Sequence, residues 1–316
     1  MISFRYHIVS IVSVFLALAV GVALGGGPLK GEVDNTLVQQ VQADRKTKAA
    51  LQAEISSLKS GNDFQDSFAA TVGPGLVADQ LKGRVVSLVV LPGADQADVS
   101  GLTRLVGQAG GTVGGTLRAG NGLVDVGNKQ LVDQLGSQLM DGTSGVSVSQ
   151  SASGYERIGA LIARAIGTED NGGARVDNSA NSILAGLSTA GLMSAEGNFN
   201  RRGSLVLFVA GSGSGSAEQK QGSNTIVTTL AQAVDANTDG VVVAGPLESA
   251  HAGGLVKAIR DDVTASRDVS TVDALGHTAG QVVTVLALAG QANGKTGQYG
   301  AVDAANGAMP GASTGQ

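Results

Sequence analysis

An uncharged apolar run near the N-terminus constrains this chain more than any other feature. Residues Ile8–Leu24 read IVSIVSVFLALAVGVAL. As a helix, about 17 residues rising about 1.5 Å each span about 26 Å, close to the roughly 30 Å hydrocarbon core of a bilayer. The uncharged sequence continues to Leu29, which gives the helix enough length to cross. We therefore predict a transmembrane anchor over residues 1–29.

The residues around this run indicate its orientation and its fate. Arg5, His7 and the N-terminal amine precede it, and positive charge at the start favours a cytoplasmic N-terminus with the bulk of the chain extracytoplasmic. A cleaved signal peptide is the alternative, because Ala23-Leu24-Gly25 has the spacing of a cleavage site. The apolar run is longer than the usual hydrophobic region of about 7–15 residues, which favours a retained single-pass anchor.

Small residues recur along the predicted anchor. Ala17, Gly21 and Gly25 are four residues apart and therefore share one helix face. In lipid, a face of small side chains lets a second helix approach closely. We predict that this face packs against another membrane helix.

A heptad pattern occupies residues 30–62. Its seam positions alternate spacings of four and three residues, and most of them are apolar. They are Leu37, Val41, Asp44, Lys48, Leu51, Ile55 and Leu58. This spacing predicts a parallel coiled coil, and hence a homodimer or higher oligomer. A single amphipathic helix packed on its own globular domain is the alternative. Gly61-Asn62-Asp63 is predicted to end the helix.

Strand and helix patterns alternate through residues 63–292. Continuous apolar runs predict buried parallel strands, and amphipathic runs predict the helices between them. The strands are predicted at 84–91, 112–117, 204–210, 240–244 and 269–272, and the helices at 99–109, 129–140, 155–166, 179–193, 225–236, 250–260 and 278–291. The fold class is therefore α/β, with a Rossmann- or flavodoxin-like, mostly parallel sheet. The domain has a point of subdivision near 141–203, and 293–316 is predicted to be a flexible tail.

Composition removes several classes of function. A net charge of −5, without clusters of basic and aromatic residues, argues against nucleic acid as a partner. The absence of cysteine excludes disulfides, zinc–thiolate sites and a cysteine nucleophile. The chain also lacks G-x-S-x-G and H-E-x-x-H. We predict no enzyme activity, no catalytic residue and no cofactor.

Two places in the α/β domain are candidates for ligand binding. Strand ends at 92–95, 245–248 and 270–273 bring Asp95, Glu248 and Asp273 to a predicted crevice, although these acids also suit helix caps. The sequence GSGSGS at 211–216 follows a strand but lacks the Gly-Lys-Ser/Thr of a phosphate-binding loop. A polar linker at 217–224 then separates it from the predicted helix. We predict a flexible connection here, with nucleotide binding as the alternative.

Candidate metal ligands are sparse. His251 and His277 are the two weak candidates in the α/β domain, and the chain has neither Met-x-x-Met nor His-x-His. Because Cu(I) prefers clustered sulfur ligands, a direct copper site would have to combine distant residues or residues from several copies.

Several blocks of the sequence resemble a known family. MISFRYHIVSIVSVFLALAVGVALG, LKGRVVSLVVLPGAD, GVVVAGPLESAHAGGLVKAIRDD, VSTVD and GQVVTVLALAGQANGKTGQYG are similar to the actinobacterial MctB-type copper transport proteins. The resemblance covers residues 1 to about 300. It implies an actinobacterial cell-envelope protein, assigned to the outer membrane, that serves copper efflux through a pore. Copper would then be the transported ion, and the resemblance places no copper ligand on particular residues.

The residues themselves leave other functions open. One helix cannot enclose a channel, and the predicted anchor offers only Ser10 and Ser13 as polar lining. The same architecture suits a dimeric coiled-coil scaffold that regulates a cell-wall hydrolase or a cell-division partner, whether an envelope or a cytoplasmic membrane protein. A small-molecule enzyme or binding domain is a third hypothesis.

Overall fold

The computed structural model describes residues 4–25, 29–197 and 199–311. The chain divides into two units, Met1–Phe64 and Gln65–Gln316, which are described separately. Parts of the predicted anchor (1–3 and 26–28) and of the predicted tail (312–316) lie outside the described residues.

The first unit is helical. Helix α1 spans Phe4–Gly25, and helix α2 begins at Leu29 and ends at Val77, past the boundary of the unit. The prediction that the helix ends at Gly61-Asn62-Asp63 is therefore wrong. One glycine inside a helix costs only about 1 kcal/mol, which the surrounding helix-forming residues outweigh. Pro74 lies inside α2 near its end, where it removes one backbone hydrogen bond of the helix at a cost of about 3 kcal/mol.

The second unit is built on a mostly parallel sheet of seven strands among the described residues, in the order β4-β2-β1-β6-β7-β8-β9. Only β4 is antiparallel to its neighbour. The strands are β1 (Val85–Val90), β2 (Thr112–Ala119), β4 (Met193–Glu196), β6 (Leu205–Val209), β7 (Gly240–Pro246), β8 (Ser270–Leu275) and β9 (Gln298–Tyr299), while β3 (Ala174–Arg175) and β5 (Arg201–Arg202) form a separate ribbon. Strands β6 and β7 are continuous apolar runs because both of their faces are covered. Strand β1 has one polar residue, the buried Ser87, whose hydroxyl donates to the carbonyl oxygen of Ile166 (2.7 Å).

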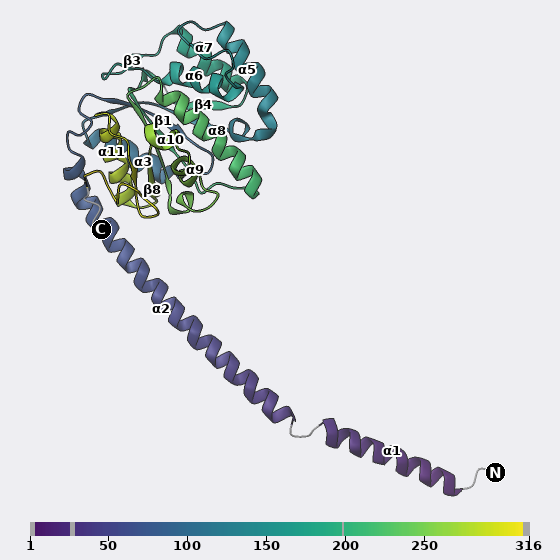
Figure 1. The fold of residues 1–316 in the computed structure, drawn as a ribbon. Helices are drawn as coiled ribbons and strands as arrows, with labels where there is room; N and C mark the ends of the chain where they lie inside the picture. The colour runs from purple at the N-terminus through teal and green to yellow at the C-terminus, as the bar shows by residue number, and fades with distance from the viewer. Residues whose placement is uncertain (1–3, 26–28, 198, 312–316) are drawn as a thin grey trace. The chain divides into compact units, whose positions relative to one another are not determined.

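Helices cover the sheet on both sides, as the ribbon in Figure 1 shows. One face packs against α3 and α11, and the other against α5 to α10. The helices of this unit are α3 (Gln96–Gln108), α4 (Asn121–Val124), α5 (Lys129–Asp141), α6 (Gly154–Ile166), α7 (Asn178–Thr189), α8 (Ala217–Asp235), α9 (Leu255–Asp261), α10 (Ala265–Asp268) and α11 (Thr278–Gln291), with short 3₁₀ turns η1 (Val126–Asn128) and η2 (Leu247–Ala250). The order β2-β1-β6-β7-β8 is the flavodoxin-like order 2-1-3-4-5. The predicted α/β class is thus confirmed.

Three predicted helix boundaries are wrong for local reasons. Helix α9 begins at Leu255, not at 250, and Leu247–Ala250 form the 3₁₀ turn η2 instead. Helix α8 begins at Ala217, not at 225, because Ser216 and Gln219 form a capping box that satisfies the first backbone N–H groups. Helix α7 ends at Thr189, and Met193 instead begins strand β4. A turn at Gly191, with φ of 68°, separates them, which favours glycine at that position.

The C-terminal segment differs from the flexible tail predicted for 293–316. Residues Gln298–Tyr299 form β9 beside β8. Arg260 holds the segment, because it donates to the carbonyl oxygens of Tyr299 (2.8 Å) and Val302 (2.5 Å) and pairs with the fully buried Asp273 (2.8 Å). The apparent low complexity of the sequence hides these long-range contacts.

Within the second unit, the end of α2 docks on α11. The carboxylate of Asp66 accepts from the backbone N–H of Thr278 (2.8 Å) and lies 3.1 Å from Nδ1 of His277, so it caps α11. Further along, Gly73 faces Val282 so closely that a Cβ there would lie 2.6 Å from its methyl carbon. Val77 is fully buried in the core beneath.

Candidate functional site

A cleft opens at the carboxyl ends of β1 and β6. At this point the chain leaves β1 for a helix on one face of the sheet and leaves β6 for α8 on the other. Parallel α/β sheets bind ligands at such a switch point. The cavity has a volume of about 100 Å³. That volume holds several water molecules, or a small ligand of comparable size.

The floor of the cleft is apolar, and its rim is formed by the loop 211–215. Leu91, Val124, Val227 and Leu255 are the larger apolar side chains that line it. Gly211 contacts the backbone of Gly93, so closely that a Cβ would meet its carbonyl oxygen. This close approach joins the ends of β1 and β6 and requires glycine.

The loop 211–215 leaves its backbone donors free. Gly213 has φ of 72° and Gly215 has φ of 104°, which favour glycine at both positions. In the described part of the chain, the N–H groups of residues 211–215 have no hydrogen-bond partner. The flexible connection predicted for GSGSGS is, in the structure, the wall of a cleft.

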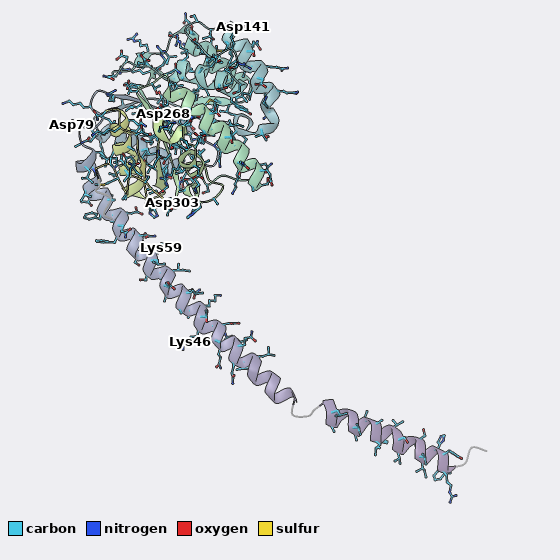
Figure 2. All side chains as sticks on the ribbon, in the orientation of Figure 1. Lys46, Lys59, Asp79, Asp141, Asp268 and Asp303 are labelled. Carbon is cyan, nitrogen blue, oxygen red and sulfur yellow. The ribbon has the colours of Figure 1, made fainter. Side chains whose placement is uncertain are left out.

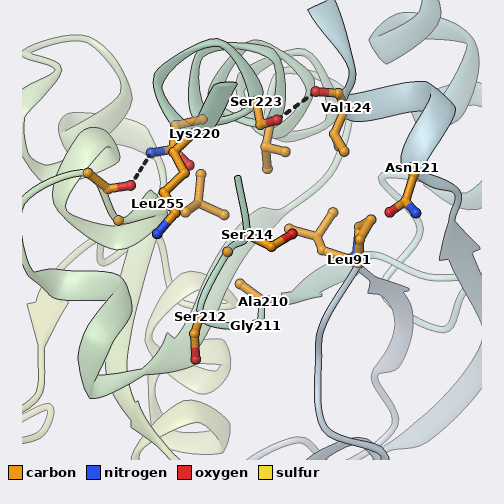
Figure 3. A pocket seen from close by; sticks show the side chains of 16 residues that line it. Leu91, Asn121, Val124, Ala210, Gly211, Ser212, Ser214, Lys220, Ser223 and Leu255 are labelled. Carbon is orange, nitrogen blue, oxygen red and sulfur yellow. Dashed lines mark hydrogen bonds between the residues drawn. The ribbon is translucent and has the colours of Figure 1, made fainter. Parts of the chain in front are cut away.

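The polar side chains that line this cleft are those of Asn121, Ser212, Ser214, Lys220, Ser223 and Asn224 (Figure 3). Ser223 donates to the carbonyl oxygen of Val124 (2.7 Å), and Asn224 donates to that of Gly253 (3.0 Å). The half-buried Lys220 is the one charged side chain among the lining residues. No aspartate, glutamate, histidine or methionine lines the cleft, so its charge is positive.

The helix that borders the cleft does not present a free N-terminus. The hydroxyl of Ser216 accepts from the backbone N–H of Gln219. The pKa of Glu218 is lowered, because its carboxylate accepts from its own backbone N–H and from the hydroxyl of Ser216. The first turn of α8 thus satisfies its own donors, and any anion in the cleft would be held by the 211–215 loop and Lys220.

The three acids predicted at the crevice lie apart from this cleft. Asp95 is the N-cap of α3 and accepts from the backbone N–H of Ala97 (2.8 Å). Glu248 is exposed in η2. Asp273 is buried in the ion pair with Arg260. The sequence prediction included the end of β1, where Pro92 lines the cleft, but took the ends of β7 and β8 as its neighbours in place of the end of β6. Local sequence patterns do not reveal the strand order that locates the switch point.

The predicted metal candidates do not assemble a site within the described residues. His251 is exposed, and His277 pairs with Asp66 alone. No group of three or more His, Cys, Asp or Glu side chains in the described ranges is placed to hold a metal ion. Met193 is buried in the core, and Met140 is packed against it.

Helix α1 fits a membrane span. It is the one helix of the described residues that is long and apolar enough to cross a bilayer, with a mean hydropathy of 2.6 and all of its residues exposed. Ala17, Gly21 and Gly25 lie on one face of α1, and a Cβ on either glycine would meet nothing. The face predicted for helix packing is open in the single chain.

The seam of α2 is equally open. The side chains of Leu37, Val41, Leu51, Ile55 and Leu58 are between 47% and 63% exposed, and Asp44 and Lys48 are also exposed. Figure 2 shows the side chains of this stretch, around Lys46 and Lys59, projecting freely from the helix. These apolar side chains are therefore available to a partner.

Comparison with known proteins settles the family. The model of a family described as "Copper transport outer membrane protein, MctB" matches residues 1–310. The chain belongs to the MctB family. Similar proteins include the copper transporter MctB of Mycobacterium tuberculosis and that of Mycobacterium bovis, each 28% identical over 310 residues, which are 95% of this chain and 96% of the relative. The copper transporter MctB of Mycobacterium leprae is 31% identical over 319 residues, with the same coverage. The resemblance expected from the sequence blocks is thus confirmed.

The copper function in the name of the MctB family contrasts with the ligand groups that this chain provides. The family is named for copper, yet the described residues contain no group of three or more His, Cys, Asp or Glu side chains placed to hold a metal ion, and the sequence contains no cysteine. The cleft at the ends of β1 and β6 instead offers backbone N–H donors and a lysine, which suit an anion. The lining of this cleft is therefore not suited to binding copper.

Proposed function

We propose that this chain serves copper transport across the cell envelope, with copper as the transported ion and α1 as a single-pass anchor. The match of the MctB family over residues 1–310 carries the proposal. The apolar length of α1 and the basic residues Arg5 and His7 before its core support an N-terminus in the cytoplasm and a folded unit outside it. Since the chain lacks recognisable catalytic motifs, the proposed role is non-enzymatic and needs no resident cofactor.

Transport through one chain alone is physically implausible, so the proposal requires several copies or a partner. A single helix has no interior, and α1 carries only Ser10 and Ser13 as polar groups within its apolar core. The open face at Ala17, Gly21 and Gly25 and the open seam of α2 both support self-association. The oligomer we propose is held by helices in and beside the membrane.

Copper accumulation in cells that lack this chain tests the proposal. We expect more cell-associated copper than in the parent strain, and restoration by the full chain. A chain without residues 4–25 should fail to restore it, while a chain with Ser10→Ala should restore it if the serines do not line the path. Unchanged copper accumulation in the deletion strain would contradict the proposal.

A dimeric scaffold is the second candidate function, supported by the exposed seam of α2. In this proposal, two copies form a coiled coil that recruits an envelope or membrane partner, such as a cell-wall hydrolase acting at division. Five apolar seam side chains, each about half exposed, need a partner to be stabilised in water. The scaffold needs no copper path through α1.

Charge placed on the seam tests the oligomer. Leu51→Asp with Ile55→Asp should convert the purified chain from an oligomer to a monomer in analytical ultracentrifugation, because two buried charges would face each other across the seam. Ala53→Asp with Ser57→Asp, which lies off the seam on the same turns, is the matched control and should remain oligomeric. A wild-type chain that sediments as a monomer would remove the basis of this proposal.

A further inference from the structure

The cleft at the ends of β1 and β6 has the chemistry of an anion site, and the copper function does not use it. It combines apolar lining side chains, the four backbone N–H groups of residues 211–214, for which the described structure has no hydrogen-bond partner, and one lysine, without a carboxylate among its lining residues. We propose that this cleft binds a phosphate monoester that carries an apolar group.

The donors define the charged end of the ligand. The N–H groups of residues 211–214 are consecutive along the lining of the cleft, and Gly213 among them has a positive φ. Ser214 and Asn121 also line the cleft with unpaired polar side chains. An excess of donors over acceptors fits a tetrahedral oxyanion, because a phosphate offers several acceptor oxygens at once.

Lys220 supplies the balancing charge. It lies one turn inside α8, half-buried, and no ion pair engages its ammonium group in the described structure. Figure 3 shows Lys220 on the opposite side of the cleft from Asn121, with Ser214 between them. An unpaired lysine beside free N–H groups is an unsatisfied positive region that a phosphate would neutralise.

The floor defines the other end of the ligand. Leu91, Val124, Val227 and Leu255 present carbon to the cleft, and the volume of about 100 Å³ is smaller than a nucleotide requires. A compact apolar group attached to the phosphate would bury against these side chains. The ligand class is therefore a small phosphate monoester, and not a dinucleotide or a soft metal ion.

Calorimetry on the full chain in lipid nanodiscs, with phenyl phosphate as the probe, tests the proposal. We expect phenyl phosphate to bind more tightly than inorganic phosphate, and phenol to bind weakly or not at all. Benzoate, which carries a carboxylate in place of the phosphate, is the comparison ligand. Tighter binding of benzoate than of phenyl phosphate would overturn the choice of phosphate. No binding of phenyl phosphate at millimolar concentrations would overturn the site itself.

Variants locate the site. Lys220→Met should weaken phenyl phosphate at least about tenfold, since it removes a charge-assisted hydrogen bond, and Lys220→Arg should retain most of the affinity. Lys82→Met is the matched control, because Lys82 is exposed and precedes β1, at the amino end of the strand and so at the end opposite the cleft, and it should bind like wild type. Asn121→Asp adds a negative charge across the cleft and should also weaken binding. Equal affinity of wild type and Lys220→Met would contradict the assignment.

This site and copper transport are independent. Phenyl phosphate binding is measured without copper, and copper accumulation is measured without phenyl phosphate. Either result can fail while the other stands.

Discussion

The buried ion pair between Arg260 and Asp273 is predicted to hold the C-terminal segment on the sheet. Asp273 is fully buried and accepts from Arg260 (2.8 Å) and from the backbone N–H groups of Ala301 (2.7 Å) and Val302 (3.1 Å). Asp273→Asn keeps the shape but leaves the guanidinium of Arg260, itself only 7% exposed, without its counter-charge. Removing one partner of a buried pair costs about 3–5 kcal/mol, and we expect about 3 kcal/mol because the amide retains one acceptor oxygen.

Urea unfolding of residues 65–316, followed by circular dichroism, measures this cost. With a slope of about 3 kcal/mol per molar urea, a loss of about 3 kcal/mol moves the midpoint down by about 1 M. Asp261→Asn is the matched control, because Asp261 pairs with Lys257 at 2.6 Å on the surface and its side chain is 60% exposed. That change should cost less than about 1 kcal/mol. Equal midpoints for the two variants would refute the reasoning that burial makes the difference.

Three further predictions follow from the packing, the charges and the anchor. Burial raises the pKa of Asp235 to about 6 from its ordinary 3.8, so the folded state binds more protons than the unfolded state between these pH values, and the free energy of unfolding should fall as pH rises from about 4 to 6. Asp235→Asn should flatten this dependence when the free energy of unfolding is measured against pH. Equal slopes for the variant and the wild type would contradict the prediction. Gly73→Ala should destabilise the second unit by about 1–3 kcal/mol in urea unfolding, because the added methyl group overpacks against Val282. This loss should vanish when Val282→Ala is also present. Losses that simply add in the double variant would argue against this contact. A chain without residues 1–28 should remain in the supernatant after high-speed centrifugation of lysed cells, and its recovery with the membrane would show that α1 is not the sole anchor.

Local sequence patterns correctly predicted the strands and helices whose structure is determined by residues close to them in the sequence. The mostly apolar runs at 84–91, 204–210 and 240–244 are strands β1, β6 and β7, because strands covered on both faces take mainly apolar residues. Helix α11 also spans the predicted 278–291. These segments carry their structural signal within a few residues.

Features that depend on distant contacts were missed. Strand β9 is two residues long, and its place is set by the reach of Arg260 from α9, which no local pattern records. The cleft was missed for the same reason, since the elements that neighbour β6 determine whether GSGSGS is only a connection or a loop that lines a cleft. Lys220 was overlooked because the capping box of Ser216 and Gln219 was not recognised as a helix start.

Single-channel recording with the purified full chain in planar bilayers tests the central claim most directly. Bathed in a copper salt, the chain should give discrete conductance steps whose frequency rises more steeply than the protein concentration, because several copies must assemble. A chain without residues 4–25 should give none. A full chain that inserts into the bilayer as an oligomer, yet conducts no copper at any protein concentration, would contradict the account.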